Sequence, residues 1–117
     1  MKRNYKKFLT SEEIIRTLKE HSDTLMKYKV KKIGLFGSFA KGNQKKESDI
    51  DFLVEFDMSA FDENFKGLSD NFIGLAFYLE DLFGRRVELI TNGSLSPYIQ
   101  PYIEKEVKWY ETGLTIS

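Results

Sequence analysis

The sequence predicts an α/β fold, in the broad sense that includes α+β, with a mixed sheet of three to five strands and helices mainly on one side. Segments with helical spacing alternate with strand-like segments in the order helix, strand, helix, strand, helix, strand, helix. The 117 residues have room for a single domain, spanning 1–117. About two-fifths of the positions are apolar and many are aromatic, which is enough to build a core without disulfides.

The first half of the chain predicts one helix and two strands around a tight turn. Residues 1–8 form a basic segment that we expect to be a flexible tail. Residues 10–27 predict a helix, because Thr10 can cap it and Glu13 completes a capping box. The remaining elements of this half are a strand over 29–36, the turn Gly37-Ser38 with a short helix behind it, a polar loop over 42–48 and a strand over 49–56.

The second half predicts the longest helix, a third strand and a last helix. Its elements are a surface loop over 57–66, a helix over 68–83 ended by Gly84, a strand over 86–91, a helix over 97–106 and a return to the sheet edge over 107–110. The second and third strands are the ones that carry acidic residues.

Charge and cysteine content exclude several classes of function. Eighteen basic residues balance eighteen acidic ones, so we expect no stable nucleic-acid binding and no membrane-surface binding. No apolar run reaches a transmembrane length. The chain contains no cysteine, which fits a reducing compartment. We expect a cytoplasmic protein.

Gly37 and Ser38 stand where a strand turns into a helix. A glycine there lets backbone amides approach a ligand closely, and the helix start supplies unpaired N–H groups. Ser38 adds a hydroxyl that can donate to a phosphate oxygen. The turn therefore predicts a phosphate-binding site, although Gly-Ser alone is also common in ordinary turns.

Asp49 and Asp51 lie two residues apart on the predicted second strand. Their carboxylates leave the same face, while Ile50 enters the core. A shared proton or a cation would relieve their repulsion, and beside phosphates the expected cation is Mg²⁺. Glu88, between Val87 and Leu89, would join them if its strand lies beside the second. Three carboxylates around one or two Mg²⁺ ions suit nucleotidyl transfer. Taken alone, each of these residues could equally be a solvated residue on the polar face of a half-exposed strand.

At these residues the chain resembles the DNA polymerase beta-like nucleotidyltransferases. Their signature is Gly-Ser, ten residues, then Asp-x-Asp, and this chain has it from Gly37 to Asp51. The sequence Gly-Ser-Phe-Ala-Lys-Gly, followed by Ser-Asp-Ile-Asp-Phe-Leu-Val, is similar to the motif of their shortest branch, the minimal nucleotidyltransferases (MNT). The likeness runs from about Lys32 to Thr91.

The resemblance implies roles for five residues. Gly37 and Ser38 would bind the triphosphate of ATP, and Asp49, Asp51 and Glu88 would hold the metal and carry the catalysis. The family usually has aspartate where Glu88 stands. Many relatives of this size are encoded beside a HEPN-type toxin and act as its antitoxin, and some transfer AMP from ATP to a tyrosine of that toxin.

Other interpretations stay open at this stage. The chain could neutralise a partner by binding alone, or act on a small molecule as larger relatives do. His21 is expected to be a surface or helix-end residue, and Lys41 either a phosphate contact or a solvated lysine. The remaining aromatic and apolar residues could be core or a partner surface; they are Ile73, Phe77, Tyr98, Tyr102, Trp109 and Tyr110.

Overall fold

A four-stranded mixed sheet forms the centre of the molecule in a computed structural model that describes residues 9–114. The strands are β1 (Val30–Phe36), β2 (Ile50–Phe56), β3 (Val87–Thr91) and β4 (Lys108–Glu111), and their order across the sheet is β3-β2-β1-β4. β1 is antiparallel to both β2 and β4, whereas β2 and β3 run parallel. β4 is thus an edge strand, as the sequence predicted. The expected basic tail, residues 1–8, lies outside the described residues.

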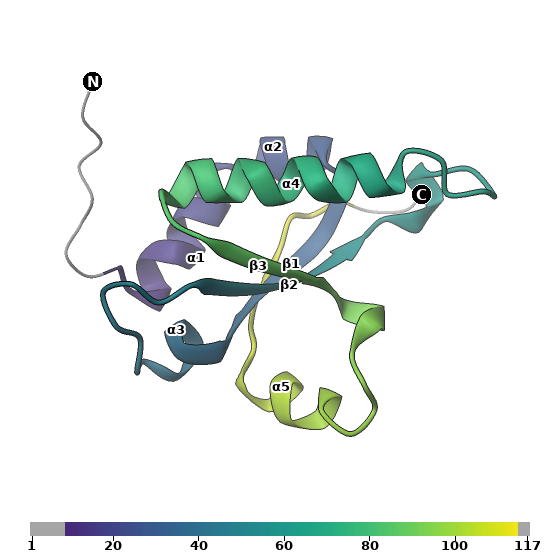
Figure 1. Cartoon of the computed structure of the whole chain (residues 1–117). Helices are drawn as coiled ribbons and strands as arrows, with labels where there is room; N and C mark the ends of the chain where they lie inside the picture. The colour runs from purple at the N-terminus through teal and green to yellow at the C-terminus, as the bar shows by residue number, and fades with distance from the viewer. Residues whose placement is uncertain (1–8, 115–117) are drawn as a thin grey trace.

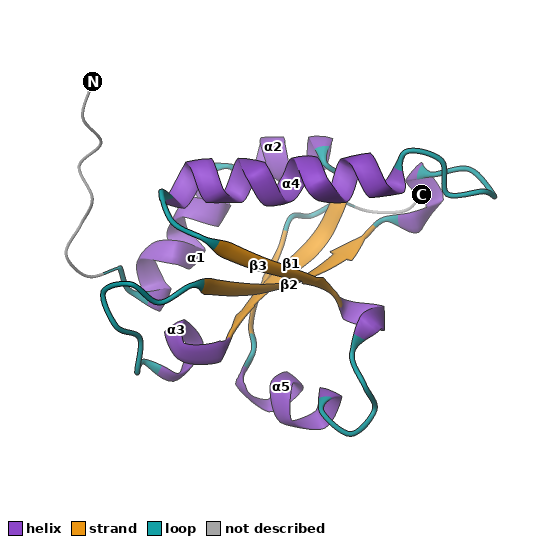
Figure 2. Ribbon diagram, in the orientation of Figure 1, coloured by secondary structure: helices purple, strands orange, loops and turns teal. Residues whose placement is uncertain are grey.

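The helices are α1 (Ser11–Glu20), α2 (Ser22–Lys27), α3 (Gly37–Lys41), α4 (Leu68–Phe83) and α5 (Gln100–Glu106). Helices α1, α2 and α4 form a layer on one face of the sheet, whereas α5 lies on the other side (Figure 1). Two short 3₁₀ turns span Met58–Ala60 and Asn92–Ser94. Figure 2 shows α4 above the strands and α5 below them. Within the described residues no helix has the length and apolar character needed to cross a membrane.

The main core lies between the sheet and the layer of α1, α2 and α4. Ile50, Phe52 and Val54 of β2 are fully buried, as their alternation predicted. They join Leu75 and Leu79 of α4 in one apolar cluster. Burial of such side chains is the main favourable term in folding.

The opposite face of the sheet is partly covered by the C-terminal segment. A β-carbon at Gly34 would collide with the side chains of Val107 and Trp109, so these two residues lie directly on the centre of β1. Leu53, the register partner of Gly34, is fully buried on the same face. The C-terminal segment therefore covers the middle of this face, whereas Asp51 at the start of β2 stays partly exposed.

The predicted helix over 10–27 is wrong in one respect, since it is broken at His21. The backbone of His21 leaves the helical region, with φ −111° and ψ 26°. Its N–H donates to the carbonyls of Thr17 and Leu18, and its Nδ1 lies 2.8 Å from the Thr17 oxygen. The non-helical conformation of His21 ends α1, and the chain restarts as α2. The cap predicted at Thr10 is confirmed, because its Oγ1 accepts from the Glu13 N–H.

The other boundaries agree with the prediction or shift by a few residues. α4 begins at Leu68 and ends at Phe83 as predicted, and Gly84, which follows it, has a left-handed backbone conformation. β2 begins at Ile50, so Asp49 lies just before the strand instead of within it. The last helix starts at Gln100 and not at residue 97, with Pro101 in its first turn.

Candidate active site

A strand-turn-helix unit forms the first wall of the site. Phe36 ends β1 in an extended conformation, and Gly37 then takes φ +73°, in the region that favours glycine. α3 follows for five residues and ends at Gly42, whose φ is +77°. The N–H groups of Gly42 and Asn43 both donate to the Ser38 carbonyl. The predicted turn between β1 and α3 is therefore present, with a glycine at each end of the helix.

Gly37 and Asp51 are in direct contact across β1 and β2. Asp51 is the register partner of Phe36, so its side chain reaches the turn that follows Phe36. A β-carbon built on Gly37 would collide with the Asp51 carboxylate at Oδ2. Because Gly37 has no side chain, the Asp51 carboxylate can lie beside the backbone of the turn.

The Asp51 carboxylate also faces Glu88. The parallel pairing of β2 and β3 sets Asp51 opposite Glu88, as was expected if the two strands were neighbours. The pKa of Asp51 is raised to about 6, chiefly by burial and then by the charge of Glu88, hydrogen bonding with Glu88 and the charge of Asp49. We call these two facing carboxyl groups the acidic pair.

Asp49 is less tightly joined to this pair. It is exposed, and its charge contributes least to the raised pKa of Asp51. Among residues 9–114, no three His, Cys, Asp or Glu side chains are arranged so that they could hold a metal ion together. The structure thus brings Asp51 and Glu88 together and leaves Asp49 nearby at the end of the loop before β2.

The sequence did not point to Arg85, which contacts the same region. Its Nη1 donates to the carbonyls of Lys46 and Ser48, at 3.3 Å each. Its guanidinium carbon lies 5.3 Å from the ring centroid of Phe39 in α3. The sequence offers one indication of its role. Arg85 directly follows Gly84, which ends a helix, and it precedes the strand that carries Glu88.

Two residues weighed as candidates have structural partners instead. His21 is held at the junction of α1 and α2, as its contact with Thr17 shows. Lys41 forms an ion pair with Glu106, at 3.5 Å between Nζ and Oε2. That pair links α3 to α5, while the Lys41 side chain stays 53% exposed, as expected of a solvated lysine.

The aromatic and apolar residues left open by the sequence divide into two groups. Tyr110 packs against the core and donates to Ser22 on α2, and Trp109 covers Gly34. The others are exposed large side chains on α4 or at α5; they are Ile73 (52%), Phe77 (67%), Tyr98 (85%) and Tyr102 (73%).

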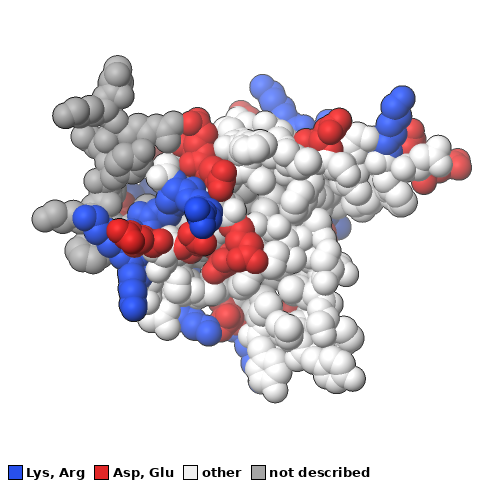
Figure 3. Space-filling view, in the orientation of Figure 1, with Lys and Arg blue, Asp and Glu red and all other residues white. Residues whose placement is uncertain are grey.

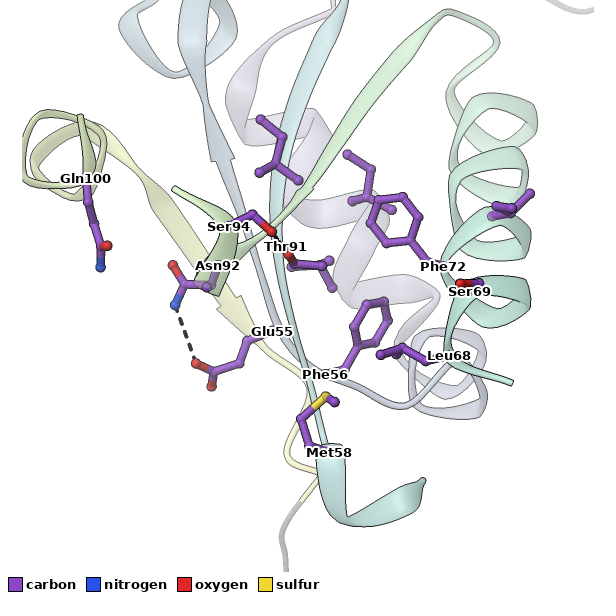
Figure 4. A pocket seen from close by; sticks show the side chains of 15 residues that line it. Glu55, Phe56, Met58, Leu68, Ser69, Phe72, Thr91, Asn92, Ser94 and Gln100 are labelled. Carbon is purple, nitrogen blue, oxygen red and sulfur yellow. Dashed lines mark hydrogen bonds between the residues drawn. The ribbon is translucent and has the colours of Figure 1, made fainter. Parts of the chain in front are cut away.

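Charged side chains gather at the end of the sheet where β2 and β3 begin. Figure 3 shows acidic groups there beside basic ones, while the part of this face over α5 is mostly uncharged. The opposite ends of β2 and β3 border a cavity of about 830 Å³ that reaches to α4. Phe56, Phe72 and Thr91 line it, and Asn92 donates to Glu55 at its rim, at 3.4 Å (Figure 4). Neither Asp51 nor Glu88 lines this cavity, which is therefore separate from the acidic pair.

Comparison with known proteins agrees with this geometry. Residues 11–110 match the nucleotidyltransferase domain family. A candidate protein adenylyltransferase of Methanocaldococcus jannaschii is 44% identical over 100 residues, which is 84% of this chain and 95% of that protein. The protein adenylyltransferase MntA of Thermococcus cleftensis is 40% identical over 100 residues, 85% of this chain and 94% of that protein.

Solved structures show the same fold. A candidate minimal nucleotidyltransferase superposes with a TM-score of 0.64 at 26% identity, over 82% of this chain and 92% of that one. A chain from a toxin–antitoxin complex with AMP-PNP superposes with a TM-score of 0.55 at 26% identity, over 86% of this chain and 72% of that one. The protein described here belongs to the nucleotidyltransferase domain family and is an enzyme of that kind.

Proposed function

We propose that this enzyme transfers AMP from ATP to a hydroxyl group of a partner protein, in a Mg²⁺-dependent reaction, and acts as the antitoxin of a HEPN-type toxin. The observation that carries the proposal is the acidic pair Asp51–Glu88 against the turn at Gly37. It sets metal-ligand chemistry beside a backbone turn suited to phosphate.

The relatives support the choice of AMP and of a protein acceptor. The relative from Thermococcus cleftensis is named a protein adenylyltransferase, and it is matched over nearly its whole length. A structural neighbour was solved as a toxin–antitoxin complex with AMP-PNP, and another as the toxin–antitoxin pair MntA-HpeT. The large exposed side chains on α4 and at α5 are of the kind that mark partner surfaces.

The donor set of the site suits magnesium. The pKa of Asp51 is raised to about 6 by burial first, then by the charge of Glu88 and, most weakly, by the charge of Asp49. A divalent cation relieves the same repulsion, and carboxylate oxygens are its preferred ligands. We assign Asp49, Asp51 and Glu88 as the residues that would hold it. When bound, magnesium supplies positive charge to the triphosphate and favours ionisation of the acceptor hydroxyl.

The residues of the chain then have distinct tasks in the transfer. Backbone amides at Gly37 and the hydroxyl of Ser38 donate to phosphate oxygens and hold the triphosphate in place. The acceptor oxygen forms a bond to the α-phosphorus as the bond to the bridging oxygen breaks and pyrophosphate leaves. Glu88 is exposed, so it can reach the acceptor hydroxyl and take its proton.

A single experiment tests this function. The purified chain is incubated with ATP, Mg²⁺ and the product of the neighbouring gene, and the intact mass of that partner is measured. We expect a gain of one or more AMP units, absent in the double variant Asp49→Ala and Asp51→Ala. A partner that stays unmodified under saturating ATP and Mg²⁺ contradicts the proposal.

One observation favours a second candidate, an antitoxin that silences its partner by binding alone. In residues 9–114 no three side chains are arranged to hold a metal ion, and Glu88 is longer than the aspartate usual in the resembled family. The double variant separates the two functions. Unchanged neutralisation by the variant supports binding alone, while lost neutralisation with binding preserved supports the enzyme.

A further inference from the structure

Arg85 joins separate segments of the candidate site with one side chain. It follows Gly84, the left-handed residue that ends α4, and precedes β3 with Glu88. Its Nη1 donates to the Lys46 and Ser48 carbonyls, which lie 39 and 37 residues away in the sequence. Both carbonyls belong to the loop over 43–48 that leads directly into Asp49.

The same guanidinium also lies against α3. It is 5.3 Å from the ring centroid of Phe39, a buried residue of that helix. A cation over an aromatic face is attracted by the ring, more strongly where water is excluded. Since α3 begins at the Gly37 turn, Arg85 ties the predicted phosphate-binding unit to the loop before Asp49.

Backbone pairing alone does not hold this loop. The N–H of Ile50 donates to the Arg86 carbonyl, which fixes the start of β2 against β3. Asp49 lies one residue before that point and is exposed. Inside the loop, Ser48 and Lys45 bond to each other, which shapes the turn. Gln44, near the start of the loop, donates to the Leu9 carbonyl, and this bond does not reach the end beside Asp49. The Arg85 contacts supply an anchor next to Asp49.

Arginine suits this task better than lysine would. Nη1 alone donates to both carbonyls, and the guanidinium extends beyond that atom, so its carbon lies 5.3 Å from the Phe39 ring centroid at the same time. The Nε of Arg85 is buried and has no hydrogen-bond partner in the described part of the chain. A buried donor without a partner is costly, so simple surface solvation does not explain the position of this side chain.

We propose that Arg85 is a positioning residue of the nucleotidyl-transfer site, which holds the 43–48 loop against α3 and thereby places the Asp49 carboxylate for the metal–nucleotide complex. The inference rests on the proposed function. It assigns Arg85 no contact with ATP, metal or acceptor. Its effect passes through Asp49, whereas Asp51 and Glu88 are already fixed by the pairing of β2 and β3.

The test compares wild type with Arg85→Gln, Arg85→Lys and Arg86→Ala. Arg86→Ala is the matched control, because it removes a neighbouring, exposed arginine side chain and keeps the carbonyl that Ile50 uses. Three quantities are measured for each: AMP transfer against Mg²⁺ concentration, affinity for Mg²⁺·ATP by calorimetry without acceptor, and the rate of trypsin cleavage after Lys45 and Lys46. Melting temperature checks the fold of each variant.

For Arg85→Gln we expect half-saturating Mg²⁺ and the Kd of Mg²⁺·ATP to rise about tenfold or more, since small misplacements of catalytic groups have effects of this order. The rate at saturating Mg²⁺ should fall much less. Cleavage after Lys45 and Lys46 should become faster, Arg85→Lys should recover part of each effect, and Arg86→Ala should match wild type. A role confined to stability would lower the melting temperature without changing the magnesium dependence.

The outcomes separate this inference from the function on which it rests. A wild-type chain that transfers no AMP at any Mg²⁺ concentration contradicts the proposed function, and calorimetry then still decides whether Arg85 affects nucleotide binding. An active wild type with Arg85→Gln identical to Arg86→Ala in Mg²⁺ dependence, Kd and cleavage overturns the inference. If Arg85→Gln does not fold, the comparison uses Arg85→Lys. The inference is then overturned if Arg85→Lys matches wild type in Mg²⁺ dependence, Kd and cleavage rate.

Discussion

The α-carbon of Gly37 lies against the carboxylate of Asp51, so closely that a side chain at 37 would take the place of Oδ2. The contact is a product of the antiparallel register, which pairs Phe36 with Asp51 at the end of β1 and β2. It means that the predicted phosphate turn and a predicted metal ligand share one small volume. Any residue with a β-carbon at 37 disturbs both.

We therefore expect Gly37→Ala to abolish AMP transfer, while Gly42→Ala keeps most of it. Both glycines have positive φ, +73° and +77°, so alanine at either costs about 1 kcal/mol of backbone strain. Only position 37 adds a collision with Asp51, because the space around Gly42 is open. Transfer rates and urea unfolding of the two variants check this. Equal activity of the two would show that the contact with Asp51 is unimportant.

Asp51→Asn should make the protein more stable at neutral pH in EDTA while removing its activity. The pKa of Asp51 is raised to about 6 in the folded protein, from about 3.9 in the unfolded chain. The folded state then binds the extra proton between these values, so the contribution of Asp51 to the free energy of unfolding falls as the pH rises from about 4 to about 6 and stays lower above that. Asparagine carries no charge and lacks this decline.

Melting temperatures from pH 3.5 to 8 in EDTA measure the effect. The two proteins should have similar melting temperatures near the acid end, and the asparagine variant should melt higher above about pH 6, where Asp51 is ionised. Added Mg²⁺ should narrow the difference, since wild type has the charged ligand. A wild type that gains stability relative to the variant as the pH rises would contradict the raised pKa.

The sequence was sufficient for the parts of this fold that depend on local pattern. The alternation of Ile50, Phe52 and Val54 predicted the buried face of β2, and all three are fully buried. The limits of α4 followed from its apolar stripe and from Gly84, which ends it in the left-handed conformation. The side-by-side position of Asp51 and Glu88 followed from alternation once their strands were neighbours.

Features that depend on register or on long-range contacts were not predictable in this way. The crowding of Gly37 against Asp51 requires the β1–β2 register, which no local pattern specifies. The break at His21 depends on a non-helical backbone conformation that ends α1 inside a continuous helical pattern. The carbonyl partners of Arg85 lie almost 40 residues away, beyond any sequence period.

Leu79→Ala and Phe77→Ser should separate the core face of α4 from its exposed face. Leu79 is fully buried in the main core, so its truncation leaves a cavity and is expected to cost 2–5 kcal/mol, roughly the range for buried leucines. Phe77 is 67% exposed two residues earlier on the same helix, and its loss should change the free energy of unfolding by less than about 0.5 kcal/mol. Urea denaturation checks both. A similar destabilisation by the two variants would mean that Phe77 is packed in solution.

Two substitutions at Glu88 separate the effect of its charge on AMP transfer from the effect of its side-chain length. Glu88→Gln keeps the size and the hydrogen-bonding capacity but cannot take a proton from the acceptor, so transfer should fall by about a hundredfold or more, as for loss of a general base. Glu88→Asp keeps the charge and should stay active. The Gln variant should also have a lower Asp51 pKa, because the charge of Glu88 is a cause of its elevation. Transfer rates and the pH midpoint of the stability curve measure the two effects separately. Wild-type transfer by Glu88→Gln would remove Glu88 from the reaction and leave Asp49 and Asp51 as the residues that carry it.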